Sequence, residues 1–340
     1  MAYKRLVDLK KDEDCIALKK DFSKAFQSAR INFLIGSGGS YPAIQTGGNI
    51  EKEIEDSLDE GNTEKANNKM FEFLVGVQKP TNDLIKNTEN EKNSIVISNY
   101  ARFLQNIEKI LIDRDDTLLP KRANIFTTNY DLYIEKAADD VSILRLNDGF
   151  LRTPSLSNRY HFSPQNFFVS TQNIGASYSY AFEIPVVNLI KIHGSLSWRK
   201  DTDEILCEFG QREIPQSPSN EDVIAYNEEF AVVLPQKAKF RQTLLDRYYY
   251  DLLRIYSNEL DNQNTLLVVF GFSFEDEHIL EITKRALKNP SLKMIIMCHK
   301  ADRVDGYMGK FNGFNNVEVV APKDDQIDLT TFNNFLMSVT

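Results

Sequence analysis

The chain has 340 residues, of which 42% are hydrophobic and 26% are charged, a composition typical of a soluble globular protein. The net charge of −9 argues against nonspecific nucleic-acid binding, which needs a basic face. No apolar run reaches the roughly 18–20 residues of a membrane span, and the charged N-terminus lacks the apolar core of a signal peptide. We therefore expect a cytoplasmic protein with no membrane contact and no direct nucleic-acid binding. Lys237, Lys239 and Arg241 could form a local basic patch, although a solvated helix face is the simpler interpretation.

The first half of the chain alternates helical patterns with short apolar runs, which predicts alternating helices and strands. The expected helices span 12–30, 49–60, 95–112 and 131–138, and the expected strands span 31–35, 125–127 and 186–192. In the first helix, Ile16, Phe22 and Phe26 should face the core. The polar stretch 61–93 is predicted to be an insertion of loops and a helix rather than core scaffold. The segment 147–184 has no clear period and is predicted to be a lid or a small inserted module.

The second half continues the alternation after a polar, turn-rich stretch at 199–222. The expected strands span 230–234, 266–270, 292–297 and 317–320, and the expected helices span 238–260, 275–288 and 328–337. Alternation of this kind predicts an α/β fold, a Rossmann-like doubly wound parallel sheet with helices on both faces and helical or loop insertions. We expect a single domain over 1–340, with its core at about 12–340.

The three cysteines, Cys15, Cys207 and Cys298, are widely separated and form no Cys-x-x-Cys pair. Three cysteines cannot build a four-cysteine zinc site, and no spacing supports a mixed Cys/His site. We therefore expect free thiols in a reducing compartment and no bound metal. Cys298 and His299 should point to opposite faces of a strand, which argues against a thiol nucleophile there.

Four predicted strands end in small or polar residues. The segments are 36–40 (GSGGS), 127–131 (TTNYD), 191–195 (KIHGS) and 271–276 (GFSFED). In parallel α/β sheets, ligands bind at the carboxyl ends of the strands. The four segments together therefore predict one nucleotide site assembled from distant parts of the sequence.

Each segment also has a plain structural interpretation. Gly36, Gly38 and Gly39 would let the backbone approach a pyrophosphate, although a tight strand-to-helix turn explains them too. The segment has neither the full G-x-G-x-x-G of a dehydrogenase nor the lysine of a P-loop. Asn129 could hold a ribose hydroxyl or a water and Asp131 could orient a ring or an amide, although both residue types also cap helices well. Gly271 and Ser273 would suit contact with phosphate or ribose, or packing alone.

His193 is the candidate base, because an imidazole titrates near neutral pH and Gly194 leaves room for a close approach. A hydrogen-bonded structural histidine is the alternative. His161 and His278 are expected at the surface or on a helix.

Taken in order, the four segments resemble the sirtuin-like NAD-binding domain over roughly residues 31–300. The resemblance implies that Gly36, Ser37, Gly38 and Gly39 cradle the phosphates of NAD. It implies that Thr128, Asn129 and Asp131 surround the nicotinamide ribose, with Asn129 and His193 catalytic and His193 the base. It also implies that Gly271 and Ser273 line the adenosine side.

The chain departs from the protein-deacylating sirtuins, which carry a four-cysteine zinc ribbon and an Asp-Phe-Arg shortly after the Gly-rich turn. The stretch 41–46 reads YPAIQT instead, and KIHGS with GFSFEDEHI is similar to the divergent prokaryotic sirtuin-like group. That resemblance implies an NAD hydrolase that depletes NAD in anti-phage defence (abortive infection). It also implies an oligomer, with a HerA-type hexameric ATPase as a separate partner. The alternatives are an NAD-dependent protein deacylase and a non-catalytic subunit that senses NAD or ADP-ribose.

Overall fold

The computed structural model describes residues 2–45, 50–114, 119–139, 141, 144–152, 160–175, 181–201, 204–232 and 244–336. The central strands are β1 (Tyr3–Val7), β2 (Arg30–Ile35), β3 (Arg122–Thr127), β4 (Arg145–Asn147), β8 (Val186–Lys191), β12 (Thr265–Phe270), β13 (Leu292–Met297) and β14 (Val317–Pro322). They form one eight-stranded sheet in the order β1-β14-β13-β12-β2-β3-β8-β4. Every neighbouring pair in it is parallel.

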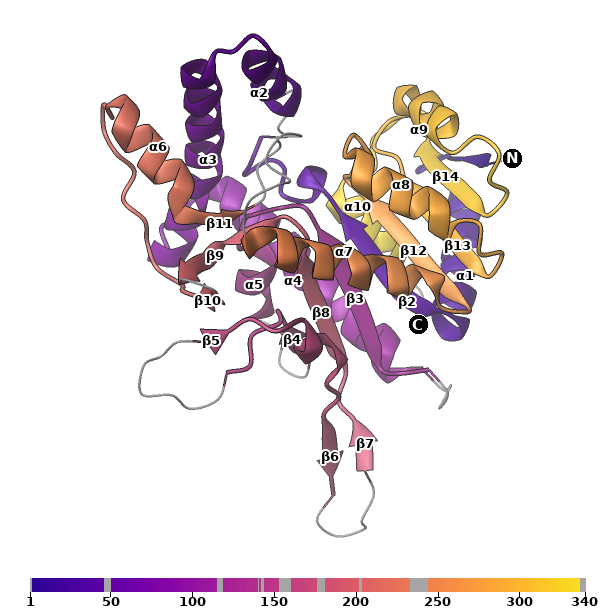
Figure 1. Ribbon diagram of the computed structural model, residues 1–340. Coiled ribbons are helices and arrows are strands. Elements are labelled where there is room, and N and C mark those ends of the chain that lie inside the picture. Colours follow the sequence, from indigo (N-terminus) through magenta and orange to yellow (C-terminus); the bar gives the residue numbers. More distant parts are fainter. Residues whose placement is uncertain are drawn as a thin grey trace.

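Helices cover both faces of this sheet (Figure 1). The α-helices of the described residues are α1 (Asp12–Ser28), α2 (Ile50–Asp59), α3 (Thr63–Lys86), α4 (Glu91–Ile112), α5 (Tyr133–Ala138), α6 (Asn220–Glu229), α7 (Leu244–Asp261), α8 (Glu277–Ala286), α9 (Val304–Lys310) and α10 (Leu329–Leu336), of which α2 and α6 pack on α3 rather than on the sheet. In Figure 1, α7 and α8 cross the front of the sheet and α4 and α10 lie behind it. The predicted α/β, Rossmann-like fold is confirmed.

Two hydrophobic cores follow from the two-residue period of the strands. In β2, Phe33 and Ile35 join the core that contains α1, α3, α4 and α10, whereas Leu34 joins the core that contains α7, α8 and α9. Because both faces of a parallel strand are buried, the sequence of β2 is mostly apolar rather than alternating, with Asn32 as its buried polar residue. The short run at 31–35 therefore gave a clear strand prediction.

The order of the strands defines a switch point between β2 and β12. From β2 the chain proceeds to β3 and β8 on one side, and then returns to β12, β13 and β14 on the other side. At a switch point, the turns after the two adjacent strands diverge to opposite faces, which opens a crevice for ligands. The turns that begin at Gly36 and Gly271 occupy this place.

A smaller antiparallel sheet lies beside the central one, in the order β11-β9-β10-β5. Its strands are β5 (Tyr160–His161), β9 (Gly194–Asp201), β10 (Glu204–Cys207) and β11 (Phe230–Val232). A separate hairpin of β6 (Gln172–Ile174) and β7 (Ala181–Glu183) projects from the lower edge of the sheet in Figure 1. Since β7 leads directly into the start of β8, this hairpin lies at the edge opposite the carboxyl ends. The hairpin part of 147–184 is therefore not a lid over the predicted site.

Several local predictions differ from the structure. The sequence pattern predicts that the stretch 61–93 is an insertion of loops and a helix rather than core scaffold. It contains one long helix, α3, whose buried Met70, Leu74 and Val77 belong to the main core, so the separation from the core is wrong. The polar residues misled the prediction because they occupy the outer side of a regular helix. Ile16 is 52% exposed, since the buried face of α1 is formed by Leu18, Phe22 and Phe26.

Other elements escaped the sequence patterns. Strand β1, helices α6 and α9, and the strand β10 within the turn-rich stretch had no prediction. They are short or carry mixed polarity, so neither period is visible in them. Three predictions fall wholly or partly outside the described residues. They are the possible basic patch at Lys237, Lys239 and Arg241, the end of the strand predicted at 230–234, and the start of the helix predicted at 238–260.

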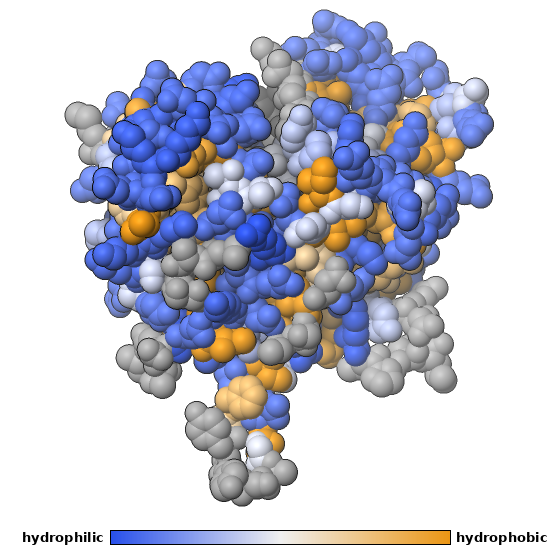
Figure 2. All heavy atoms as spheres, turned by 180° about the vertical axis from the view of Figure 1, so that it is seen from behind, coloured by the Kyte–Doolittle hydropathy of each residue, from blue (hydrophilic) through white to orange (hydrophobic). Residues whose placement is uncertain are grey.

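The surface is mostly hydrophilic on the face shown in Figure 2, with scattered apolar side chains. In the described ranges, no helix has both the length and the apolar character needed to cross a membrane. All three cysteines are free thiols, and Cys207 and Cys298 are buried. Burial raises the pKa of the Cys207 thiol to about 12, which keeps it protonated and unreactive.

A ladder of asparagines runs through the middle of the sheet. Asn124 donates to Asn32 at 2.8 Å, Asn188 donates to Asn124 at 2.9 Å and Asn147 donates to Asn188 at 3.0 Å. These residues are direct partners across β2, β3, β8 and β4. If one strand slid along its neighbour, buried amides would lose their hydrogen-bond partners. The ladder therefore favours the observed register of these four strands.

We expect Asn124→Ala to lower the free energy of unfolding by about 2–4 kcal/mol. The change leaves the amide oxygen of Asn32 buried without its partner, which costs about 1–3 kcal/mol, and it removes one hydrogen bond of Asn188, which costs about 0.5–1.5 kcal/mol. Asn188 keeps its bonds to Phe167 and Asn147. Urea unfolding measures the effect, with Asn173→Ala on the exposed β6 as the matched control. A loss below about 0.5 kcal/mol would show that the ladder does not stabilise the sheet.

A buried carboxylate joins β14 to β1 and β13. Glu318 accepts from Tyr3 at 2.6 Å, and its carboxylate lies 2.9 Å from the ammonium of Lys293 and 3.4 Å from the guanidinium of Arg5. Burial alone would raise the pKa of Glu318, but these contacts favour the ionised form and hold the pKa below its ordinary value. The stabilisation is therefore present above the pKa of the unfolded chain and is lost as pH falls through the folded pKa.

Glu318→Gln should accordingly flatten the dependence of stability on pH below about 5. The measurement is the unfolding free energy at a series of pH values between neutral and acidic. Glu281→Gln on α8 serves as control, because Glu281 is 70% exposed in its pair with Lys284. Parallel curves for the wild type and the Glu318 variant would contradict the assignment.

Candidate functional site

The four predicted segments meet at one edge of the sheet. Phe270, Ile35, Thr127 and Lys191 form a single row across β12, β2, β3 and β8, because each pairs with the next in register. The strands therefore end at the same level, and the segments that follow them lie next to one another. The convergence predicted from the sequence is confirmed, although contacts with a ligand remain a prediction.

The glycines pack the two switch-point turns against each other. A Cβ atom at Gly36 would lie 2.4 Å from the carbonyl oxygen of Gly271, and one at Gly38 would lie 2.7 Å from the Cα atom of Gly271. Gly271 itself has φ +65, a conformation that L side chains rarely adopt. A Cβ at Gly39 would lie 2.4 Å from the hydroxyl of Tyr100. Close backbone packing thus accounts for Gly36, Gly38 and Gly271, and the side chain of Tyr100 accounts for Gly39.

The backbone donors of the Gly-rich turn are engaged inside the protein. The N–H of Gly36 donates to Phe270, that of Gly38 to Gly271, and that of Gly39 to Gly36. Phosphate contact by these three groups would require the turn to rearrange, and it remains a prediction. Ser37 and Ser273 are exposed and Thr128 is half-buried, so their side chains lie at the surface of the site.

Asn129 and Asp131 are tied to the Gly-rich segment through Ser40. The amide nitrogen of Asn129 donates to the carbonyl of Gly36 and to the hydroxyl of Ser40, both at 3.1 Å. The hydroxyl of Ser40 donates in turn to Asp131 at 2.8 Å. The second carboxylate oxygen of Asp131 accepts from the N–H of Tyr133, the first residue of α5, at 3.2 Å. The N-cap residue of α5 is Leu132, so Asp131 lies one position before the cap and does not cap the helix itself.

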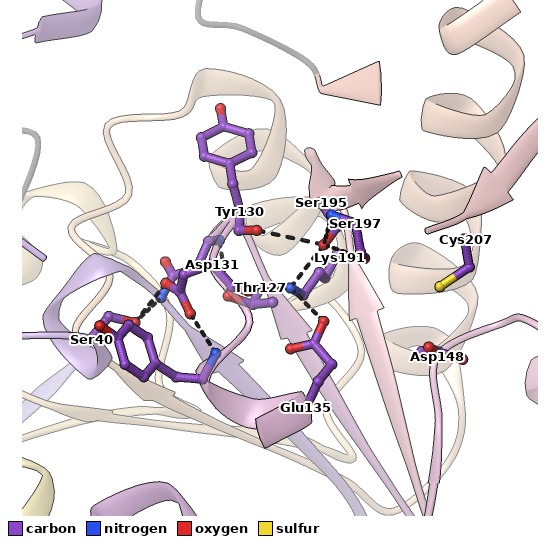
Figure 3. Close-up of polar contacts among 12 residues, drawn as sticks. Ser40, Thr127, Tyr130, Asp131, Glu135, Asp148, Lys191, Ser195, Ser197 and Cys207 are labelled. Carbon is purple, nitrogen blue, oxygen red and sulfur yellow. Dashed lines mark hydrogen bonds and ion pairs between the residues drawn. The ribbon is translucent and has the colours of Figure 1, made fainter. Parts of the chain in front are cut away.

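Lys191, at the end of β8, is a buried cation next to the turn that follows β3 (Figure 3). Its ammonium lies 2.7 Å from Glu135, donates to the hydroxyl of Ser195 at 3.1 Å, and donates to the carbonyl of Asp131. Burial raises the pKa of both Asp131 and Glu135, and the charge of Lys191 opposes that rise. The lysine thus fastens the end of β8 to the turn after β3 and partly neutralises two buried carboxylates.

His193 stands at the end of β8 between two tyrosines. Its ring centroid is 6.4 Å from that of Tyr130 and 6.0 Å from that of Tyr249. Its Nε2 lies 2.9 Å from a carboxylate oxygen of Asp276, although this contact lacks the alignment of a hydrogen bond. Phe73 of α3 packs edge-on against Tyr130, with ring centroids 5.9 Å apart. The stretch 61–93 therefore borders the site directly.

Sequence reasoning missed four residues that organise this site: Ser40, Glu135, Lys191 and Asp276. Ser40, Lys191 and Asp276 lie within the segments singled out, but nothing in their spacing indicates what they contact. Glu135 looks like an ordinary surface residue of a helix. In the described part of the chain, no group of three or more His, Cys, Asp or Glu side chains could hold a metal ion. His161 is exposed on β5 and pairs with Glu204 at 2.6 Å, away from the site.

The fold and its strand-end site define a Rossmann-like α/β protein with its candidate ligand site at the switch point. Residues 123–305, more than half of the chain, match the SIR2-like domain, and the chain belongs to this family. The matched range contains Thr128, Asn129, Asp131, His193 and the turn at 271–276, whereas the Gly-rich turn precedes it. SIR2-like domains bind and use NAD, so an NAD-related activity follows from membership. No curated protein matches the chain.

Proposed function

We propose that the protein is an NAD hydrolase that cleaves NAD to nicotinamide and ADP-ribose. The observation that supports this most is the placement of Asn129 and His193, both buried, at the ends of the neighbouring strands β3 and β8. Both lie beside the switch-point turns, in a family that uses NAD. No metal enters the proposal.

The reaction breaks the bond between C1′ of the ribose and the nicotinamide nitrogen. The electron pair leaves with nicotinamide, and positive charge develops on the ribose. The oxygen of a water molecule bonds to C1′, and a proton from that water passes to His193. General-base help of this kind contributes roughly 10²–10⁴-fold to a rate.

Asn129 would hold the water or a ribose hydroxyl through its amide oxygen. Its amide nitrogen already donates to Gly36 and Ser40, so both N–H bonds are used within the protein. Asp131, fixed by Ser40 and by the N–H of Tyr133, would orient the ribose or the nicotinamide amide. By resemblance, phosphate contacts are assigned to Gly36, Ser37, Gly38 and Gly39, and the adenosine side is assigned to Gly271 and Ser273. Thr128 is assigned to the nicotinamide ribose, together with Asn129 and Asp131.

The biological setting belongs to the same proposal. Depletion of NAD would make the protein the effector of a bacterial anti-phage defence, acting as an oligomer with a hexameric ATPase. Resemblance to prokaryotic sirtuin-like effectors supports this, together with the missing zinc ribbon. Such an enzyme must stay silent until it is triggered, and a partner could supply that control.

The test is to incubate the purified protein with NAD, alone and with the product of a neighbouring ATPase gene, and to measure nicotinamide and ADP-ribose. Stoichiometric release of both products supports the hydrolase. Release that occurs only with an acylated peptide would indicate a deacylase instead. Tight binding of NAD with no product in the assembled complex would indicate a sensor.

A further inference from the structure

A carboxylate from the far end of the chain contacts the histidine of the site. Asp276 precedes α8, and its two oxygens have separate partners: Oδ1 accepts from the N–H of Ile279 at 3.0 Å, and Oδ2 lies 2.9 Å from Nε2 of His193. We propose that Asp276 is a positioning residue for His193. Its carboxylate keeps the imidazole proton on Nε2, so that Nδ1 is free to accept the proton of the attacking water. The inference rests on the proposed NAD hydrolysis.

The carboxylate of Asp276 is a polar group that lies directly against Nε2. The atom is buried and forms no hydrogen bond within the described residues, and the ring is flanked by Tyr130 and Tyr249. A small rotation of the ring or the carboxylate would align the N–H with Oδ2. Such catalytic contacts are often poorly aligned in the absence of substrate and tighten when it binds.

Asp276 remains an acceptor at neutral pH. Burial alone would raise its pKa, but contact with His193 and the N–H of Ile279 outweighs burial and lowers the pKa below the ordinary value. An ionised carboxylate has no proton to donate, so Nε2 must carry the proton that lies between the two groups. The same logic fixes the tautomer of histidines in other Asp–His pairs.

The turn that presents Asp276 is held rigidly. Phe274 has φ 58, which is uncommon for a residue other than glycine, and its ring packs between Phe272 and Phe311. Lys310 of α9 donates to the carbonyls of Ser273 and Phe274 at 2.9 and 3.0 Å. A conformation of this kind persists only where the surroundings over-determine it, and such positions cluster at functional sites.

The sharpest variant is Asp276→Asn, which keeps the shape of the side chain. Its amide oxygen can still cap α8, because the helix N-terminus needs an acceptor there. The amide nitrogen then faces Nε2 as a donor, so Nε2 has to accept and the proton moves to Nδ1. Asp276→Ser is the second variant, since serine also caps the helix but cannot reach His193.

The experiment records the ¹⁵N imidazole spectrum and the rate of nicotinamide release for both variants. With four histidines in the chain, His193→Gln assigns the signal. We expect the Nε2–H tautomer in the wild type and the Nδ1–H tautomer in Asp276→Asn. We also expect kcat to fall on the order of 10²-fold in both variants with little change in KM, because the base is misoriented while substrate contacts remain.

Asp328→Asn is the matched control, because Asp328 accepts from the N–H of Thr331 at 2.7 Å at the start of α10 and is exposed. It should leave both readouts unchanged, and thermal unfolding checks that all variants fold. An unchanged tautomer with unchanged kcat in Asp276→Asn would overturn the inference while the proposed function stands. Absence of NAD cleavage in the wild type would overturn the proposed function. The ¹⁵N spectra of the wild type and Asp276→Asn would then still show whether Asp276 sets the tautomer of His193.

Discussion

His193→Gln lowers the rate of nicotinamide release from NAD by about 10²–10⁴-fold, because the general base is lost while the volume of the side chain is largely kept. Glutamine is preferred to alanine here, since alanine would open a cavity between the rings of Tyr130 and Tyr249. The measurement is kcat and KM for NAD under the conditions in which the wild type is active. We expect the loss mainly in kcat.

The matched control is His161→Gln, on the exposed strand β5 of the smaller sheet. Its activity should equal that of the wild type. Asn129→Ala completes the series, and it should also lose most activity, although it removes the bonds to Gly36 and Ser40 as well. Thermal unfolding separates the two effects. Full activity in both the His193 and the Asn129 variants would rule out the proposed mechanism.

Lys191→Met lowers the free energy of unfolding by about 3–5 kcal/mol, the usual cost of removing one partner from a buried ion pair. The change leaves Glu135 buried without its cation, and it removes the donor to Ser195 and to the carbonyl of Asp131. One oxygen of Glu135 already lacks a hydrogen-bond partner. Urea unfolding at constant pH measures the loss.

The double variant Lys191→Met with Glu135→Gln tests the cause. Removing the second charge should recover part of the lost stability, because no uncompensated charge then remains. Lys284→Met is the matched control, since Lys284 pairs with the exposed Glu281 on the surface of α8 and such pairs contribute about 0–1 kcal/mol. A loss below 1 kcal/mol for Lys191→Met would contradict the role of this lysine.

The same variant connects stability to the site. Lys191, the last residue of β8, donates to the carbonyl of Asp131, and His193 follows two positions later in the turn between β8 and β9. A loosened contact would therefore let the turn after β3 move relative to the imidazole. We expect reduced nicotinamide release from Lys191→Met even at temperatures where the variant stays folded.

The parallel sheet could be predicted because its strands are short and mostly apolar, as at 31–35 and 292–297. The limits of prediction appear in α3 and β10. In 61–93, the many polar residues hid the helical spacing of Met70, Leu74 and Val77. The strand at 204–207 was not predicted because it lies inside a turn-rich stretch. Local composition cannot tell a polar loop from the outer side of a helix that packs elsewhere.

Two kinds of information therefore define this protein. The sequence by itself determined the fold class and the candidate residues Asn129 and His193, because short apolar runs and the polar residues after them are local signals. Only the tertiary structure decided that Ser40 joins Asn129 to Asp131, that Gly38 packs on Gly271, and that Asp276 contacts His193. The physical reason is that these contacts join segments far apart along the chain. They depend on the order and register of β12, β2, β3 and β8, which no local period records.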